Sequence, residues 1–243
     1  MHPIQIGTAG WAVAKETANL FPETGTHLER YGQRLNAVEI NSSFYRSHRR
    51  STYERWAASV PESFRFSVKV PKLVTHVNRL VACEGELDQF LGETSGLGDK
   101  LGPVLVQLPP SLAWDEAASQ RFFSTFRSCH TGSIVCEPRH NTWFTDEVDR
   151  MLKEFRISRV AADPAVVPQA ASPGGSLEEI YYRWHGSPRI YYSAYDDDAL
   201  ARLTSGIRIN ESNARSTWCI FDNTAENAAM RNAISLAQRL DVS

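Results

Sequence analysis

The chain has 243 residues, of which 42% are hydrophobic, and a formal net charge of −2 at pH 7. This composition is typical of a globular protein with a large core, and the length suits a single α/β barrel as well as two smaller domains. The sequence has no run of about 18 apolar residues and no charged leader before an apolar stretch, so we expect neither a membrane span nor a signal peptide. The near-neutral charge argues against a dominant nucleic-acid-binding face but leaves room for a local basic patch.

The cysteines indicate a reducing compartment. Cys83, Cys129, Cys136 and Cys219 show no Cys-x-x-Cys spacing, and the last two lie inside apolar runs. Cysteines in such runs usually behave as small core residues. We therefore predict free thiols, with no disulfide and no zinc site, and a cytoplasmic location.

Eight short runs of apolar residues are predicted to be strands, and most end in a polar residue, a glycine or a proline. In chain order they cover residues 4–7, 37–41, 64–69, 104–107, 134–137, 158–163, 180–186 and 217–221. Apolar residues at helical spacing lie between most of these runs, which predicts about seven helices. Side-chain caps are predicted for three of them, pairing Thr26 with Glu29, Ser51 with Glu54 and Asn223 with Glu226.

The alternation of strands and helices predicts parallel crossover units. Eight such units in about 240 residues favour a (β/α)8 barrel formed by one domain, residues 1–243. Residues 164–177 have no helical period, so we expect a loop to replace most of the helix between strands six and seven. The alternative architecture is a doubly wound open sheet.

Polar side chains recur where the predicted strands end. In chain order they are Thr8, Gly10 and Trp11, then Glu39 and Asn41, Lys69, Gln107, the group Glu137, Arg139 and His140, then Asp163, the group Arg183, His185 and Gly186, and finally Asp222 and Asn223. The carboxyl ends of parallel strands meet at one face, and barrel enzymes carry out their chemistry there. We therefore predict a binding or catalytic site at this face.

Each candidate residue has a predicted role. The acid/base and charged groups assigned to catalysis are Lys69, Glu137, His140, Asp163 and His185, because burial and neighbouring charges tune such groups for proton transfer. The groups assigned to substrate binding are Trp11, Glu39, Asn41, Tyr45, His76, Gln107, Arg139, Trp143, Arg183, Tyr195 and Asn223, with the arginines holding an anion and the aromatic rings stacking on a ring. At least one cation of the set Lys69, Arg139 and Arg183 should contact a carboxylate, since buried charges need partners.

Structural interpretations of the same residues stay open. Glu137 and Arg139 are also consistent with a plain ion pair at the rim, and Glu39 with a structural partner for Lys69 or Arg183. His185 on an apolar strand is also consistent with a hydrogen-bonded core histidine. The aromatic candidates are equally compatible with the core.

Seven motifs in order make the chain similar to the YecE-like family, a domain of unknown function found in bacteria and archaea. They cover residues 7–11, 39–45, 66–71 with 75–76, 107–110, 137–140 with Trp143, 183–186 and 221–223. The resemblance implies a TIM barrel but brings no reaction with it. The chain departs from the family at Asp222-Asn223, where two asparagines are common, and in its compact loop at 164–177.

These features favour an enzyme, provisionally a hydrolase, that acts on a small anionic or phosphate-containing ligand such as a nucleotide or a sugar. One alternative is a metal-dependent phosphodiesterase or endonuclease, with Glu137, Asp163, His185 and Asp222 as ligands of a divalent ion. Lys69 weakens that alternative, because an ammonium group repels a cation. The other alternative is a non-catalytic protein that binds nucleic acid or a nucleotide. The sequence does not define a cofactor or an oligomeric state.

Overall fold

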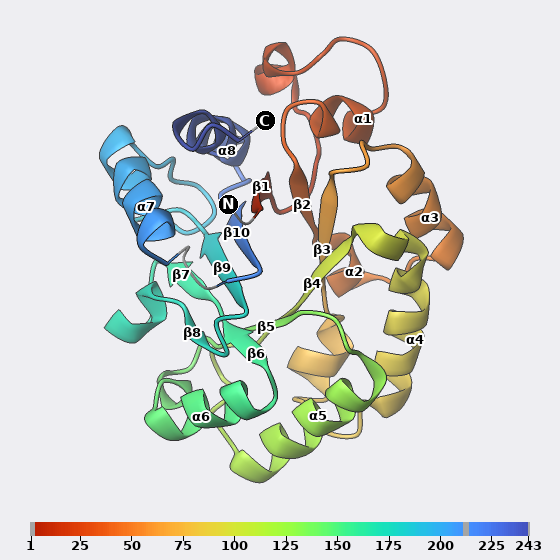
Figure 1. The fold of residues 1–243 in the computed structure, drawn as a ribbon, viewed down its shortest axis with the longest axis vertical. Coiled ribbons are helices and arrows are strands. Elements are labelled where there is room, and N and C mark those ends of the chain that lie inside the picture. The colour runs from red at the N-terminus through yellow and green to blue at the C-terminus, as the bar shows by residue number, and fades with distance from the viewer. Residues whose placement is uncertain (1–2, 211–213, 243) are drawn as a thin grey trace.

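The computed structural model describes residues 3–210 and 214–242, and it has a mixed α/β fold in which helices lie around the outside of the strands (Figure 1). One sheet has the strand order β1 (Ile4–Thr8), β10 (Ser216–Phe221), β9 (Glu179–Trp184) and β7 (Ala161–Asp163). The other has the order β2 (Ala37–Ile40), β3 (Arg65–Lys69), β4 (Leu101–Gln107), β5 (Ile134–Glu137), β6 (Ile157–Arg159) and β8 (Gly174–Gly175). Neighbouring strands pair in parallel, except for the antiparallel pair β6–β8.

The predicted parallel α/β organisation is confirmed, but the described strands fall into two sheets and do not make one closed ladder. The sheets meet at two places. On one side only Val160 separates β6 from β7, so one continuous stretch of chain contributes a strand to each sheet. On the other side an isolated parallel bridge joins Ala9 to Glu39, and the Gly10 N–H donates to the Glu39 carbonyl at 2.9 Å.

The helices cover the outer faces of the sheets. The α-helices are α1 (His27–Gly32), α2 (Ser42–Tyr45), α3 (Arg50–Ala58), α4 (Glu84–Thr94), α5 (Glu116–Cys129), α6 (Asp146–Glu154), α7 (Asp197–Asn210) and α8 (Ala228–Arg239). Short 3-10 or π turns are η1 (Lys15–Leu20), η2 (Leu73–Val77), η3 (Ser95–Lys100), η4 (Asn141–Trp143) and η5 (Pro168–Ala171). Residues 164–178, all of them described, contain η5 and β8 but no α-helix, as predicted. No helix in the described ranges is long and apolar enough to cross a membrane.

One of the three predicted caps is confirmed. Thr26 and Glu29 form a reciprocal capping box at the start of α1. The box of Ser51 and Glu54 is wrong, because α3 already begins at Arg50, which places Ser51 inside the helix, where Glu54 instead pairs with Arg50 at 3.1 Å.

The predicted cap at Asn223 is also wrong. Asn227, which is in the left-handed region with φ 60°, precedes α8 and makes no side-chain cap. The Asn223 amide is buried and donates to the Ser193 carbonyl and to Asn232 Oδ1, so its side chain is engaged away from the helix start.

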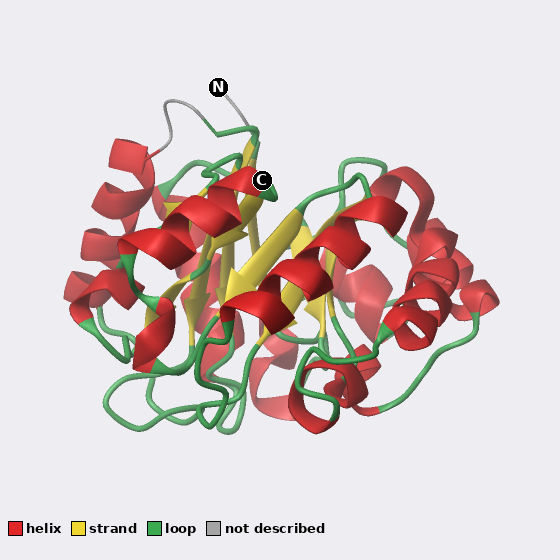
Figure 2. Cartoon of the chain, turned by 90° about the horizontal axis from the view of Figure 1, so that it is seen from below, coloured by secondary structure: helices red, strands yellow, loops and turns green. Residues whose placement is uncertain are grey.

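The core has an outer and an inner part. The outer part packs the helices against the sheets, and all four cysteines are free, three of them buried. The inner part is a smaller cluster to which both sheets contribute, formed by Ala37, Leu105, Val135, Val160, Tyr181, Trp218 and Ile220. In the side view of Figure 2 the chain enters β1 near the top, so the carboxyl ends of the strands face the lower edge, where long loops gather. The candidate site lies at that end.

Candidate functional site

Arg183 is the centre of the charged cluster. Its guanidinium donates to both Glu39 oxygens, through Nε at 2.9 Å and Nη2 at 2.6 Å, and its Nη1 donates to Glu137 Oε2 at 2.8 Å. Nη2 also donates to Asp222 Oδ2 at 3.1 Å. The arginine side chain is 1% exposed, so these are buried ion pairs, and they confirm the prediction that a cation of the site contacts its carboxylates.

Strand register explains why these residues converge. Successive side chains of a strand point to opposite faces, so Arg183 lies on the same inner face of β9 as Tyr181 two residues earlier. Glu39 pairs in register with Ser67 of β3, and the Tyr181 hydroxyl lies 2.9 Å from both side chains. A polar layer therefore sits directly on the apolar inner cluster, toward the carboxyl ends of the strands.

The arginines decide the charge state of Glu137. Burial on its own would raise the pKa of this carboxyl, but Arg139, Arg183 and His185 outweigh it and hold the pKa well below its usual range. In the same way Arg183 and His185 overcome burial and lower the pKa of Asp222. A carboxylate that is so strongly stabilised is a weak base, and Glu137 is therefore better suited to orient its neighbours than to accept a proton.

His185 is fully buried between two carboxylates and an arginine. Its Nδ1 lies 3.0 Å from Asp222 Oδ2, and its Nε2 lies 2.8 Å from Glu137 Oε1 and 2.7 Å from Arg139 Nη2. A neutral ring that donates from Nδ1 to Asp222 accepts from Arg139 at Nε2, whereas a cationic ring donates to both carboxylates. Arg139 and Glu137 are thus alternative hydrogen-bond partners of Nε2.

Lys69 differs from the other cations of the cluster. It lies at the end of β3 and is 7% exposed, with its Nζ 4.2 Å from the centroid of the Phe44 ring. Within the described ranges its ammonium group has no carboxylate close enough for a salt bridge, because Arg183 and Arg139 take the nearby carboxylates. Burial lowers the pKa of Lys69 to about 8, Arg183 adds to this effect, and Glu39, Asp222 and Glu137 oppose it.

His76 lies on the lysine side of the cluster, since both it and Lys69 contact the Phe44 ring, and Asn41 comes directly after β2. The His76 ring packs edge-on against Phe44 with centroids 4.9 Å apart, and its Nδ1 lies 2.8 Å from the Thr75 hydroxyl. Burial, with Lys69, Lys72 and Arg139, lowers the pKa of His76 to about 4, so its ring is neutral at pH 7. Asn41 follows Glu39 by two residues, and its buried Oδ1 has no hydrogen-bond partner among the described residues.

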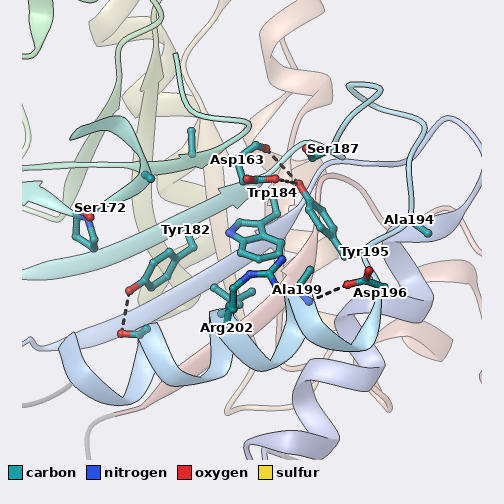
Figure 3. A pocket seen from close by; sticks show the side chains of 15 residues that line it. Asp163, Ser172, Tyr182, Trp184, Ser187, Ala194, Tyr195, Asp196, Ala199 and Arg202 are labelled. Carbon is teal, nitrogen blue, oxygen red and sulfur yellow. Dashed lines mark hydrogen bonds between the residues drawn. The ribbon is translucent and has the colours of Figure 1, made fainter. Parts of the chain in front are cut away.

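Asp163 and Tyr195 do not join the charged cluster. The Tyr195 hydroxyl donates to Asp163 Oδ2 at 2.6 Å, and both residues line a separate cavity on the outer side of β7 and β9 (Figure 3). Asp163 pairs in register with Trp184, whose side chain points away from the face that carries Arg183. The prediction that Asp163 shares a site with Glu137 and His185 is therefore wrong.

Other predicted residues have structural partners or lie at the surface. His140 lies just before η4 and accepts from the Thr142 N–H, while the buried Trp143 donates from Nε1 to the Leu112 carbonyl at 2.9 Å. Gln107 stands in register with Glu137, but its amide donates to the Leu108 carbonyl. The Trp143 N–H is therefore already paired, whereas Gln107 has one amide hydrogen engaged and keeps its amide oxygen.

The two remaining aromatic candidates differ in exposure. Trp11 is half-buried and packs edge-on against Trp56 at 5.0 Å between centroids. Tyr45 is 78% exposed and packs edge-on against Phe44. Tyr45 is thus the candidate whose ring is accessible near the lysine side.

Sequence reasoning missed three participants. Tyr181 and Ser67 each stand two residues before a predicted site residue on the same strand, so the period of two carried a usable signal for both. Tyr191 has no such signal, because its ring reaches His185, with centroids 6.0 Å apart, from the loop after β9.

The arrangement bears on the metal-dependent alternative. The described residues contain no group of three or more histidine, cysteine, aspartate or glutamate side chains placed to hold a metal ion. Arg183 lies where Glu39, Glu137 and Asp222 meet, and Asp163 lies elsewhere. These contacts give no support to the predicted ligand set.

The fold and the site define an α/β protein with a buried arginine–carboxylate cluster at the carboxyl ends of its parallel strands. The chain belongs to the family described as "Protein of unknown function DUF72", whose sequence model matches residues 5–243. This agrees with the resemblance to the YecE-like family noted from the motifs.

Two curated relatives are both named as UPF0759 proteins. The UPF0759 protein YecE of Escherichia coli (strain K12) is 32% identical over 154 residues, which are 61% of this chain but only 56% of YecE. The UPF0759 protein YunF of Bacillus subtilis (strain 168) is 28% identical over 276 aligned positions, covering 98% of this chain and 95% of YunF.

Solved structures of the family have the same fold. A DUF72 family protein from Thermotoga maritima superposes with a TM-score of 0.83 at 20% identity, over 99% of this chain and 100% of the other. A DUF72 family protein from Enterococcus faecalis gives a TM-score of 0.83 at 20% identity, over 99% and 96% of the two chains.

Proposed function

We propose that this protein is an enzyme that acts on a small anionic substrate at the carboxyl ends of its strands, with Lys69 as the group that exchanges a proton. The observation that carries the proposal is the position of Lys69, which is nearly buried at the end of β3 and has no carboxylate partner among the described residues. Cations that only stabilise a fold are normally paired when buried. Lys69 is therefore available for a ligand.

The protonation of Lys69 supports both binding and chemistry. With its pKa lowered to about 8, about a tenth of the lysine side chains are neutral amines at pH 7. The ammonium form attracts an anion, and the amine form is a general base near physiological pH. This replaces Glu137 by Lys69 as the leading acid/base group, with His185 as the second.

Arg139 supplies the anchor for the anion. Its side chain is 13% exposed, against 1% for Arg183, and it contacts Glu137 at 2.7 Å, so it forms the accessible boundary of the cluster. The neutral ring of His76 adds a hydrogen-bonding group close to Lys69. Together these residues suit a substrate with a phosphate or carboxylate group, such as a sugar phosphate or a nucleotide.

The proposal includes the finer architecture, a (β/α)8 barrel. It is supported by the stretch of chain that links β6 to β7 and by the bridge between Ala9 and Glu39, which join the two sheets at both edges. Slow hydrogen exchange of the Gly10 amide, which donates to the Glu39 carbonyl, is expected if the ring of strands is continuous. Exchange of this amide at the rate of an exposed loop would count against closure.

Anion binding tests the proposed substrate class. Calorimetric titration with inorganic phosphate and with sugar phosphates should detect binding, and Arg139→Ala should weaken it by roughly 1.5–3 kcal/mol, the range for hydrogen bonds to charged groups. Glu137 keeps Arg183 and His185 as partners in this variant, so the fold should persist. Arg150→Ala removes an exposed arginine of α6 and is the matched control. Equal binding by both variants and the wild type would show that the anion site lies elsewhere.

The state of Lys69 can be measured without a substrate. The lysines of the chain are Lys15, Lys69, Lys72, Lys100 and Lys153, so NMR of 13C-dimethylated lysines should resolve them. One resonance should titrate with a pKa of about 8 and disappear in Lys69→Met. Lys100, whose ammonium donates to the Ala57 and Val60 carbonyls, is the buried reference. If every lysine titrates near 10.4, as in model peptides, the acid/base role is excluded.

A further inference from the structure

A cavity of about 390 Å³ lies apart from the charged cluster, between the outer face of β7 and β9 and helix α7 (Figure 3). Tyr182 and Trp184 line it from the strand, on either side of the inward-pointing Arg183. Its volume falls within the range of small-ligand pockets, about 300–1,000 Å³. The cavity is therefore large enough for a ligand of its own.

The fold explains why this space exists. In a parallel α/β unit a helix normally packs on the strand that it follows, but residues 164–178 form only η5 and β8. The short segment 171–173 closes one side of the cavity, and α7 closes another with Ala199, Arg202 and Leu203. The missing helix thus leaves the outer face of β7 and β9 partly uncovered.

Three kinds of group meet at the cavity. Trp184 is half-buried and packs on Tyr195 with ring centroids 4.3 Å apart, which gives an aromatic wall. The Asp163 carboxylate is held by the Tyr195 hydroxyl and keeps further acceptor capacity. Figure 3 shows Arg202 projecting from α7 toward this wall, and its guanidinium has no hydrogen bond or salt bridge with any residue that the structure describes.

One oxygen of the second carboxylate at the cavity is engaged at a helix start. Asp196 Oδ1 accepts from the Ala199 N–H at 2.8 Å and so caps the start of α7. Arg202 is the cation of this lining and has no ion-pair partner among the described residues, and Asp163 is an acceptor beside the aromatic wall. This combination calls for a ligand with a flat ring, hydroxyl donors and an anionic group.

We propose that this cavity binds a nucleoside 5′-monophosphate. The base stacks on Trp184, the ribose hydroxyls donate to Asp163, and the phosphate accepts from Arg202. Stacking on an aromatic side chain tolerates any base, because every base has a π face. Carboxylates bind ribose hydroxyls in dinucleotide sites, and arginine matches the geometry of phosphate.

Calorimetry on the full chain tests the proposal with AMP, adenosine, ribose 5-phosphate and inorganic phosphate as probes. AMP should bind more tightly than the other three, because only AMP meets all three groups. Arg202→Gln should weaken AMP binding about tenfold or more, as expected for a lost charge-assisted contact, and leave adenosine binding unchanged. Trp184→Leu should weaken AMP and adenosine alike.

Two controls separate this site from the charged cluster. Arg208→Gln makes the same change on the exposed side of α7, outside the cavity, and should leave AMP binding unchanged. Arg139→Gln alters the proposed anion site, where a nucleotide can also bind, and should leave unchanged the component of AMP binding that is lost in Arg202→Gln. Absence of AMP binding overturns the proposal, as does a loss in Arg139→Gln with none in Arg202→Gln. Because Arg202 is exposed, its variant should fold even if Trp184→Leu does not.

Discussion

Arg183→Met is expected to lower the free energy of unfolding by about 3–5 kcal/mol, the cost of leaving buried charges without their partner. Glu39 and Asp222 lose a guanidinium at 2.6 Å and 3.1 Å, and Glu137 keeps only Arg139 and His185. This is a large part of the stability of an ordinary domain, which is about 5–15 kcal/mol. Urea denaturation followed by circular dichroism measures the change.

The pH dependence of the stability loss shows whether it comes from the buried charges. In the wild type the lowered pKa values of Glu137 and Asp222 stabilise the fold at any pH above their unfolded pKa values of about 4. This contribution is lost as the pH falls from about 4 through the lower pKa values of the folded state. In Arg183→Met the same carboxyls lose the cation that stabilised their charge, so the deficit should be largest near neutral pH and shrink in acid. A deficit that does not change with pH would point to lost packing instead.

Arg156→Met is the control for this experiment. Arg156 also forms a bidentate pair, with Glu178 at 2.9 Å and 3.1 Å, but 56% of its side chain is exposed. Exposed ion pairs contribute little to the free energy of unfolding, because water screens them, so Arg156→Met should change it little. Arg183→Met combined with Glu39→Gln should recover part of the lost stability, since one buried charge is removed. If Arg183→Met alone does not fold, the unfolding of this double variant can still be measured.

Lys69→Met is expected to lower turnover by about 10²–10⁴-fold, the usual contribution of a positioned proton-transfer group. Exchange of substrate C–H for deuterium in D2O, followed by NMR on a panel of sugar phosphates and nucleotides, measures proton transfer without knowledge of the product. Because the amine form acts as the base, the wild-type rate should rise with pH through about 8.

Lys69→Arg separates binding from chemistry. Arginine keeps the positive charge but does not lose its proton in proteins, so this variant should retain anion affinity and lose exchange. Full exchange activity in Lys69→Arg would mean that Lys69 acts only through its charge. Exchange that is lost in Arg150→Ala as well would indicate a general defect of the preparation.

Much of the fold was predictable because burial leaves a local pattern. Residues 134–137 form an apolar run that stops at Glu137 and Pro138, and the structure places β5 at Ile134–Glu137. The parallel arrangement was predictable because such apolar runs alternate along the chain with segments whose apolar residues have helical spacing. Helix caps were less predictable. Ser51 matches the cap pattern but lies inside α3, which begins at Arg50, and the Asn223 side chain is engaged by tertiary contacts with Ser193 and Asn232.

The error at Asp163 has a clear origin. The prediction assigned a residue to the site because it stands at the end of a strand. Its side chain must also point to the inner face of the sheet. Val160 belongs to the inner cluster, so Asp163, three residues later, lies on the opposite face by alternation. The same period places Arg183 and His185 together on the inner face, where the predicted contacts with carboxylates are found.

The sequence by itself determined which residues stand at the strand ends, since strand length and polar termination are properties of neighbouring residues in the chain. Only the tertiary structure decided how the charges pair. Glu39, Glu137 and Asp222 come from strands far apart in sequence, and the broad, forked guanidinium of Arg183 reaches all three at once. As a consequence Lys69 has no carboxylate partner within the described part of the chain. Its lowered pKa depends on the depth of its burial, a property of the packed molecule that no local pattern encodes.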